Sequence, residues 1–174
     1  MGITSAACDI RLNTVLTTEQ RLRFQDTQII RRLLRTAKTI AMVGLSSEKT
    51  KASNMVGAYL QDEGYQVIPV NPRATEILGV QSYPDLASVP FPIDIVDIFR
   101  PTNEVSAIVD DAIAVGAKAV WMQLRIVDLP AAERALAAGL DVVVDRCIKM
   151  EHGRYCGGLH WAGMNTEVLT ARRA

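Results

Sequence analysis

The chain has 174 residues and a mass of 19.0 kDa, a length typical of one domain with a short extension. Hydrophobic residues make up 49% of it and charged residues 22%, a balance that excludes a largely disordered protein. Its 19 Lys and Arg equal its 19 Asp and Glu in number, which disfavours general binding to nucleic acid or to an anionic membrane.

The apolar runs and the cysteines of the sequence indicate the cellular compartment of the protein. No apolar run is long enough to span a bilayer, and residues 1–13 lack the basic segment and apolar stretch of a signal peptide. Three cysteines cannot all pair, and Cys147 with Cys156 does not make a disulfide framework. We therefore expect a reduced, cytoplasmic protein with no membrane and no nucleic-acid partner.

A helical extension is predicted before the first strand. The first twenty residues are polar and aperiodic, and a helix begins either at Thr17-Thr18 or at Asp26, which favours a helix N-terminus. Apolar residues then recur at helical spacing: Ile29, Ile30, Leu33, Leu34 and Ala37. The basic face of this helix is interpreted as solvated rather than anion-binding. We assign residues 1–38 to this extension.

Short apolar runs then alternate with helical segments. Strands are predicted at residues 40–43, 67–70, 95–99, 119–122 and 140–144. Helices are predicted at residues 54–63, at 102–115 with Thr102 as the cap, and at 128–139 with Asp128 as the cap. Pro69 is unfavourable inside a central strand. Residues 79–92 contain three prolines and are predicted to hold one short helical turn at residues 85–87.

This alternation indicates the fold class. Strands that are apolar on both faces, joined by helices of about ten residues, favour a parallel sheet with helices on both sides. The predicted fold is α/β, a Rossmann-like three-layer sandwich with a parallel five-stranded sheet. We assign the sheet domain to residues 39–150. Residues 151–174 are assigned to a C-terminal tail that docks on it.

The loop after the first strand is a candidate phosphate site, since ligands of this fold bind beyond the carboxyl ends of the strands. Gly44 permits a tight turn there, and the next helix offers free N–H groups to an anion. Hydroxyl groups and positive charges are supplied by Ser46, Ser47, Ser53, Lys49 and Lys51. The loop matches neither G-x-G-x-x-G nor the Walker A pattern, so phosphate binding and a polar surface loop are both open.

The second strand ends in Asn71-Pro72-Arg73. An NAD site has an acidic residue at this place to hold the ribose hydroxyls. Here the carboxylate is absent and an arginine is offered, which suits a ribose that carries a phosphate. NADP and the 3′-phosphoadenosine of coenzyme A both meet that description. An exposed arginine in a turn is the alternative.

Three further loops follow the other strands. Pro101 and Thr102 direct a helix N-terminus at the cleft, next to Phe99 and Arg100. Gln123 either faces a ligand or is a buried amide bonded to the backbone. Arg146 is expected to pair with Asp145 or Glu151. Cys147 either faces a ligand or packs in the core, as unpaired cysteines commonly do.

These motifs, taken in order, resemble a known family. They are Val43-Gly44-Leu45-Ser46, Ser53-Asn54, residues 67–72, residues 94–100, residues 121–124 and residues 144–147. Over about residues 39–151 the chain resembles the small CoA-binding proteins of the YccU type. Those proteins are similar to the N-terminal CoA-binding domain of the succinyl-CoA synthetase alpha subunit.

The resemblance implies a role for each motif. The loop from Gly44 through Ser53, with Asn54 beside it, would take the phosphates of coenzyme A. The adenosine end would be flanked by Asn71, Pro72 and Arg73, and the pantetheine path lined by Phe99, Arg100, Pro101 and Thr102. Gln123 and Cys147 would lie toward the thiol. The further ligase domain with its phosphorylatable histidine does not fit in this length, so ligase activity is not implied.

Catalysis by this chain alone is not expected. Both histidines, His152 and His160, follow the sheet, and no G-x-S-x-G motif is present. A nucleophile–base pair of Cys147 and His152 rests on sequence proximity alone. Cys147, His152, Cys156 and His160 could bind a transition metal, but their spacing departs from the usual zinc knuckle. A docked tail is favoured, and no metal is predicted.

The sequence therefore favours a non-catalytic module that binds coenzyme A or an acyl-CoA, as a carrier, sensor or partner subunit. One alternative is an NADP-dependent oxidoreductase, and another is an interaction protein with a vestigial nucleotide cleft. Apolar residues in the tail and the first helix favour a homodimer.

Overall fold

Five parallel strands form the central sheet of the computed structural model, which describes residues 16–157. In sheet order they are β2 (Gln66–Val70), β1 (Thr39–Val43), β5 (Ile95–Ile98), β6 (Ala119–Met122) and β7 (Asp141–Val143). Every pairing within this sheet is parallel. The predicted α/β, Rossmann-like fold with a parallel five-stranded sheet is confirmed.

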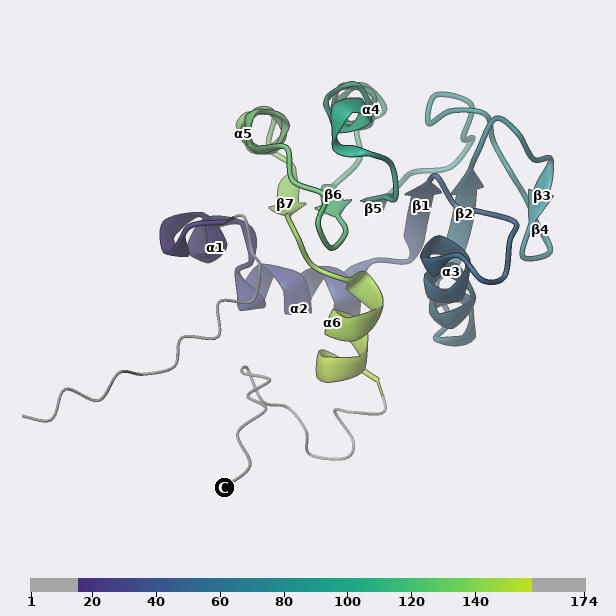
Figure 1. Ribbon diagram of the computed structural model, residues 1–174, viewed down its shortest axis with the longest axis horizontal. Helices are drawn as coiled ribbons and strands as arrows, with labels where there is room; N and C mark the ends of the chain where they lie inside the picture. Colours follow the sequence, from purple (N-terminus) through teal and green to yellow (C-terminus); the bar gives the residue numbers. More distant parts are fainter. Residues whose placement is uncertain (1–15, 158–174) are drawn as a thin grey trace, which may run out of the picture.

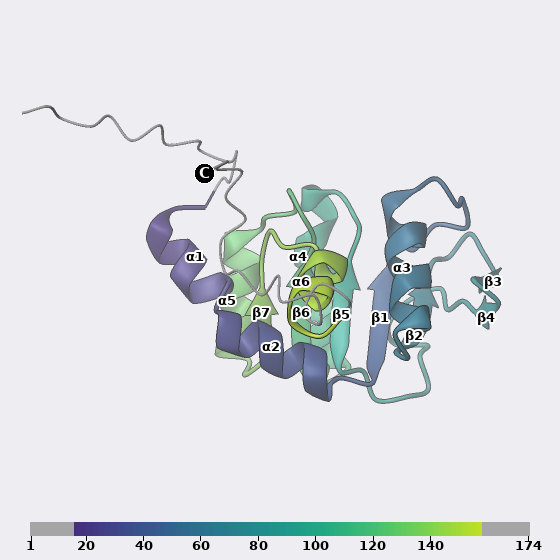
Figure 2. The same cartoon turned by 90° about the horizontal axis from the view of Figure 1, so that it is seen from below.

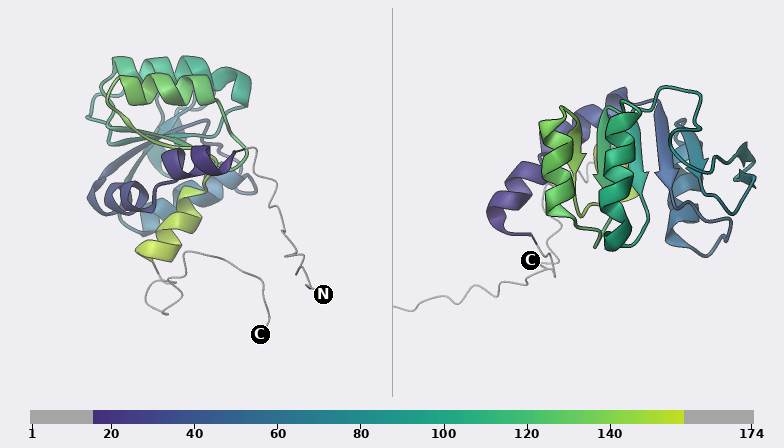
Figure 3. Two further views of the ribbon diagram at one scale, coloured as in Figure 1. Left: turned by 90° about the vertical axis from the view of Figure 1, so that its left-hand side faces the viewer. Right: turned by 90° about the horizontal axis from the view of Figure 1, so that it is seen from above.

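Helices cover both faces of the sheet and complete three layers (Figure 1). One face carries α4 (Thr102–Ala114) and α5 (Leu129–Ala137), which lie in front of the strands in the right-hand view of Figure 3. The opposite face carries α2 (Thr27–Thr36), α3 (Ala52–Asp62) and α6 (Ile148–Tyr155), seen in front of the sheet in Figure 2. Within residues 16–157, none of the helices is long and apolar enough to cross a membrane.

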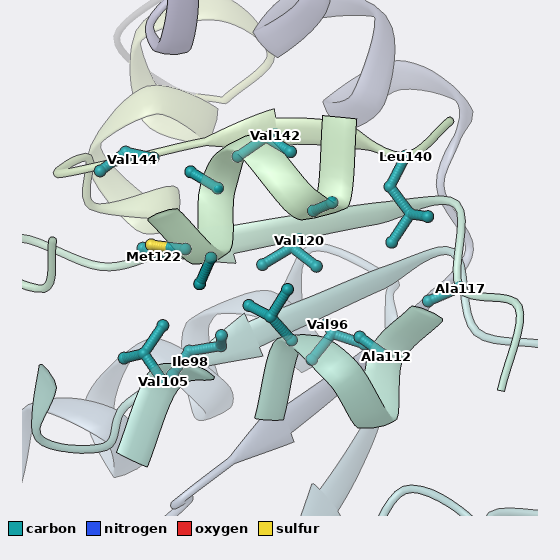
Figure 4. Close-up of a cluster of buried hydrophobic side chains, with 14 of the residues drawn as sticks. Val96, Ile98, Val105, Ala112, Ala117, Val120, Met122, Leu140, Val142 and Val144 are labelled. Carbon is teal, nitrogen blue, oxygen red and sulfur yellow. The ribbon is translucent and has the colours of Figure 1, made fainter. Parts of the chain in front are cut away.

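A cluster of buried apolar side chains fills the space between the sheet and the α4–α5 layer (Figure 4). Val96, Val120 and Val142 come from three neighbouring strands and are almost completely buried. Val105 of α4 and the alanines of α5 pack against them. Small alanine side chains let α5 approach the sheet closely, and removing these surfaces from water supplies the main driving force for this layer.

The second core, on the opposite face, is built around Trp121. This side chain is fully buried among residues of α2, α3 and α6, including Leu34, Leu60 and Ile148. Its indole Nε1 donates a hydrogen bond of 2.7 Å to the carbonyl oxygen of Arg146. The bond ties the start of α6 to the middle of the sheet.

Two short helices, rather than one, precede β1. Thr17 caps α1 (Thr18–Phe24) and accepts a hydrogen bond from the Gln20 amide, while Asp26 caps α2. Both start sites expected from the sequence are therefore used. The amide of Val144 donates to the carbonyl oxygen of Phe24 at 3.1 Å, so the end of α1 lies against the segment that follows β7.

The position of β2 explains how Pro69 is tolerated. β2 is an edge strand of the sheet, so the missing backbone N–H of Pro69 does not interrupt the hydrogen bonds between central strands. The Pro69 carbonyl oxygen accepts from the Tyr83 amide at 2.9 Å, and the Asn71 amide donates to the Tyr83 carbonyl oxygen at 2.8 Å. The segment around Tyr83 thereby covers the exposed edge of the sheet.

The connection from β2 to β5 differs from the prediction. It contains a small hairpin that was not predicted, formed by β3 (Glu76–Ile77) and β4 (Val80–Gln81). Leu78 and Gly79 at its tip both have positive φ, as a tight two-residue hairpin turn requires. The helical turn predicted at residues 85–87 is wrong. These residues form a bend and turn in which Asp85 accepts hydrogen bonds from Ser88.

Helix α6 is a further difference, and it crosses the predicted boundary between residues 150 and 151. Three of its polar residues are buried, namely Glu151, His152 and Arg154. Arg154 binds both carboxylate oxygens of Glu151, at 3.1 and 3.0 Å. The ring Nδ1 of His152 lies 2.9 Å from the Tyr59 hydroxyl of α3. Residues 151–157 thus pack onto the domain, whereas His160 and the remainder of the predicted tail lie outside the described residues.

Candidate functional site

The chain reverses its direction across the sheet between β1 and β5. From β1 it runs to β2 at one edge, and it then returns to β5 on the other side of β1 and continues to β6 and β7. The loops after β1 and β5 therefore diverge and leave a crevice at the carboxyl ends of the strands. A cavity of about 810 Å³ opens at this point.

Most of the predicted site residues line this cavity. They are Gly44, Ser46, Ser47, Lys51, Ser53, Asn71, Pro72, Arg73, Phe99 and Arg100. The strand-end rule therefore brings the ends of β1, β2 and β5 together at one place. The remaining predicted residues do not line it: Asn54, Pro101, Thr102, Gln123 and Cys147.

Helix α4 contributes a wall of the cavity that sequence reasoning missed. Glu104, Ile108 and Asp111 lie on one face of that helix, at helical spacing, and line the cavity together. Asp85 and Leu86, from the β2–β5 connection, lie there as well. Spacing alone groups the three α4 residues, but only the packing of α4 on the sheet determines that this face meets the crevice.

Gly44 allows the ends of β1 and β5 to come close together. Its φ is +88°, a conformation that L side chains rarely adopt. A Cβ atom at this position would lie 2.7 Å from Cδ of Arg100 and 2.8 Å from the carbonyl oxygen of Phe99. The glycine is therefore required both for the turn and for the close approach of the two loops.

Hydrogen bonds within the β1–α3 loop fix its shape. The Ser46 amide donates to Ser53 Oγ at 3.1 Å, and Asn54 Nδ2 donates to the Ser46 carbonyl oxygen at 2.8 Å. Ser53 and Asn54 are both buried. Asn54, a predicted ligand contact, instead holds the loop in place. Ser47 and Lys51 remain exposed on its surface.

The N-terminus of α3 opens at the same loop. Lys51 occupies the N-cap position, and no side chain there accepts from the first-turn amides. Such free N–H groups, together with the helix dipole, favour a bound anion. The Lys51 ammonium lies 3.8 Å from a carboxylate oxygen of Glu48, a loose pair between two exposed side chains.

Asn71 links the β2 end to the β1 loop. Its Nδ2 donates to the carbonyl oxygen of Leu45 at 2.9 Å, and its Oδ1 accepts from the Arg73 amide at 2.9 Å. The Arg73 side chain is exposed beside the cavity, and within residues 16–157 its guanidinium makes no hydrogen bond or ion pair. Besides hydrogen bonding from Arg100, the Arg73 charge helps to lower the pKa of Glu104. No hydrogen bond or ion pair commits it within the described residues, however, and it lies at the adenosine end that the resemblance implies.

Arg100 is committed to a neighbour. Its Nε and Nη2 donate to the two carboxylate oxygens of Glu104 at 2.8 and 2.7 Å, one turn into α4. Hydrogen bonding from Arg100 lowers the pKa of the Glu104 carboxyl. The prediction that Thr102 caps α4 is wrong, because Pro101 occupies the N-cap position and Thr102 is the first helical residue.

Gln123 and Cys147 lie on the other side of β5, near a buried carboxyl that sequence reasoning did not single out. Gln123 is buried and its Nε2 donates to Oδ1 of Asp97 at 2.8 Å. Its amide partner is therefore a side chain rather than the backbone. Asp97 is completely buried, and burial raises its pKa to about 8. The sequence signal that could have identified Asp97 is an acidic residue inside an otherwise apolar strand.

Cys147 occupies the N-cap position of α6, makes no side-chain capping hydrogen bond and is half-buried. Burial raises the pKa of its thiol, although the nearby backbone amides of Met150 and Lys149 partly oppose that rise. The His152 ring is hydrogen-bonded to the Tyr59 hydroxyl, so this bond, rather than one to the Cys147 thiol, orients it. Within residues 16–157, no group of three or more His, Cys, Asp or Glu is placed to hold a metal ion.

Known proteins share this arrangement. Residues 38–153 match a family described as the CoA binding domain. The chain belongs to the CoA-binding domain family. It is 37% identical over 123 residues to the uncharacterized protein YneT of Bacillus subtilis, covering 71% of this chain and 91% of YneT.

Solved structures and a larger enzyme extend the comparison. A hypothetical protein from Pyrococcus horikoshii is 39% identical, with a TM-score of 0.73 over 75% of this chain and 92% of that one. An ADP-forming acetate–CoA ligase of Archaeoglobus fulgidus is 31% identical over 74 residues, which are 42% of this chain and 11% of the ligase. This chain is thus similar to one segment of a much longer enzyme.

Replacing Gly44 by alanine tests the close approach of the two loops. Gly139 has the same φ of +88°, but a Cβ atom placed there would meet nothing within 4 Å, so Gly139→Ala is a matched control. We expect Gly139→Ala to cost about 1–2 kcal/mol from backbone strain. Gly44→Ala should cost about 1–3 kcal/mol more, because it also forces the loops apart. Urea denaturation measures both, and equal losses would contradict the assigned contact.

Asp97 should make stability depend on pH. Its pKa is 3.8 in the reference state and about 8 in the fold, so the folded chain keeps a proton that the unfolded chain releases between these values. Stability should therefore fall as pH rises through this window, by up to about 1.4 kcal/mol per pH unit. Asp97→Asn should remove this slope in urea denaturation series at several pH values.

Asp85→Asn is the control for that series. Hydrogen bonds from Ser88 lower the pKa of the Asp85 carboxyl, so it is ionised throughout the window in both states. This variant should keep the slope of the parent protein. A parent protein whose stability changes with pH in the same way as Asp97→Asn would contradict the assignment of a buried, protonated Asp97.

Proposed function

We propose that this protein binds coenzyme A or an acyl-CoA in the cavity at the β1–β5 switch point, and that it acts by binding rather than by catalysis. It would serve as a carrier, a sensor or the partner subunit of an enzyme. The observation that carries the proposal is the exposed Arg73 guanidinium at the end of β2, on the same cavity as the open N-terminus of α3. One site thus offers two separate places for phosphate groups.

The loop between β1 and α3 suits the pyrophosphate. Ser46, Ser47 and Lys51 surround the cavity there, and the first-turn amides of α3 are not capped by a side chain. Backbone N–H groups bind phosphate oxygens without needing a net positive site. This matters because two of the positive charges at the cavity are already paired with carboxylates. Lys51 pairs with Glu48, and Arg100 pairs with Glu104.

Arg73 suits the 3′-phosphate of the adenosine. Because its guanidinium makes no hydrogen bond or ion pair within the described residues, a phosphate need not displace a bonded group. Apolar side chains on the walls suit the flat face of an adenine: Val43, Val70, Pro72, Pro84, Leu86 and Ile108. The similar Archaeoglobus protein is named as an acetate–CoA ligase, which agrees with a CoA ligand.

Two features support a binding role rather than catalysis. The Cys147 thiol has a raised pKa, which disfavours the reactive thiolate. His152, the nearest base in sequence, is buried against Tyr59 and Tyr65. The homodimer and the cytoplasmic location belong to this proposal too, and Leu22 of α1, which is 75% exposed, suits an apolar contact between copies.

NADP+ is the competing ligand, since its ribose also carries a phosphate. The single-glycine loop departs from the G-x-G-x-x-G pattern of a dinucleotide site. The other alternative is an interaction protein whose cleft is not used. In such a protein, replacing Arg73 would not affect function.

Arg73→Ala tests the role of the guanidinium. Calorimetric titration with CoA should show about tenfold weaker binding than in the parent protein, because a charge-assisted contact to the 3′-phosphate is lost. Dephospho-CoA, which lacks that phosphate, should bind both proteins equally.

Arg134→Ala is the control, since Arg134 lies on α5 and binds Asp110 and Ser106. It should leave both affinities unchanged. If Arg73→Ala weakened CoA and dephospho-CoA to the same extent, Arg73 would not contact the 3′-phosphate.

A further inference from the structure

One polar pair beneath the carboxyl edge of the sheet is not explained by the fold. Asp97 and Gln123 lie on β5 and just after β6, both buried, with a hydrogen bond of 2.8 Å from Nε2 of Gln123 to Oδ1 of Asp97. The second carboxyl oxygen, Oδ2, has no hydrogen-bond partner within the described residues. Buried polar atoms nearly always have partners, so an unpaired one marks a place where a partner is expected.

The chemistry of Asp97 indicates what that partner is. Complete burial holds its carboxyl in the neutral, protonated form at neutral pH. Because Oδ1 accepts from Gln123, the proton belongs on Oδ2. Oδ2 is then a donor, and its missing partner is a hydrogen-bond acceptor. A charged acceptor would be costly at such depth, so the fitting partner is uncharged.

Asp97 does not line the cavity, but it lies two residues before Phe99, which does. Ile95 and Phe99 belong to the same apolar cluster as Trp121, and side chains alternate along a strand, so Asp97 lies on that face between them. Phe99 is only partly buried and lines the cavity. Cys147, at the start of α6, belongs to the same cluster.

The path from the phosphate site to Asp97 is short. In the β1–β5 register Asp97 lies opposite Met42, two residues before Gly44. Neighbouring strands are about 4.8 Å apart, so a ligand arm leaving the Gly44 loop moves by one strand spacing to reach β5. Because Asp97 is fully buried, the arm reaches it only if side chains at this edge of the sheet move aside, Phe99 among them.

We propose that the thioester carbonyl oxygen of a bound acyl-CoA accepts a hydrogen bond from Asp97, whose carboxyl Gln123 holds in place. This inference rests on the proposed CoA binding and narrows the ligand to acyl thioesters rather than the free thiol. A thioester carbonyl is an uncharged acceptor at the end of the flexible pantetheine arm. Asp97 is thus a specificity-determining residue.

Two ligands that differ in one oxygen test the inference. Acetyl-CoA carries the thioester carbonyl, and S-ethyl-CoA is its thioether analogue without that oxygen. The parent protein should bind acetyl-CoA about 3–10-fold more tightly, the usual net effect of one hydrogen bond. Asp97→Leu should bind both equally, whereas Asp97→Asn, whose amide still donates, should keep the preference.

A spectroscopic measurement separates this role from a structural one. The infrared band of acetyl-CoA labelled with carbon-13 at the carbonyl should move to lower frequency when bound to the parent protein and to Asp97→Asn. It should not move when bound to Asp97→Leu. If Asp97→Leu does not fold, two measurements on the parent protein still test the proposal. They are its relative affinities for acetyl-CoA and S-ethyl-CoA and the frequency of the bound carbonyl band.

The outcomes distinguish the two proposals. Tight binding of CoA, with equal affinities for acetyl-CoA and S-ethyl-CoA in the parent protein, would overturn the role of Asp97 and leave CoA binding intact. An unshifted carbonyl band would do the same, and a buried water would then be the partner of Oδ2. Failure to bind any of these ligands would overturn the proposed function itself.

Discussion

The parallel pairing of β1 with β5 is the contact on which the rest of the molecule depends. Ile40 lies opposite Ile95 and Val43 opposite Ile98 in the middle of the sheet, with side chains mostly sealed from water. Because β1 continues to β2 on one side and β5 continues to β6 on the other, their loops must separate at the carboxyl edge. Gly44 keeps the ends of β1 and β5 close together where the cavity opens. The candidate site follows from topology first and from side chains second.

The two faces of the sheet are built differently. The α4–α5 face has a large core of apolar side chains, which suits a layer that serves stability. The opposite face also buries polar groups, namely the Asp97–Gln123 pair, the Glu151–Arg154 ion pair and His152. Two of these are satisfied within the fold, because Arg154 takes both oxygens of Glu151 and Tyr59 bonds His152. Asp97 keeps an oxygen that is unpaired among the described residues. For this reason we place the ligand contact of this face at the end of β5, where Asp97 lies.

How far the sequence predicts this structure depends on what each signal measures. The strands were predictable because parallel strands are buried on both faces and form continuous apolar runs, as at residues 119–122. Gly44 and Arg73 were predictable as cavity residues because their place follows from topology. Helix α6 gave no apolar periodicity, since Glu151, His152 and Arg154 are buried through hydrogen bonds and charge pairs rather than through hydrophobicity. The cavity wall on α4 depends on how that helix is rotated against the sheet, which no local pattern encodes.

The most direct test of the central claim is calorimetric titration of the ligand-stripped protein with CoA and with NADP+ in parallel. The cavity at the β1–β5 switch point, with its open helix N-terminus and the uncommitted Arg73, predicts saturable CoA binding at one molecule per chain and much weaker binding of NADP+. Saturable NADP+ binding without CoA binding would contradict the account and favour an oxidoreductase. Binding of neither would leave a cleft that the protein does not use for a nucleotide.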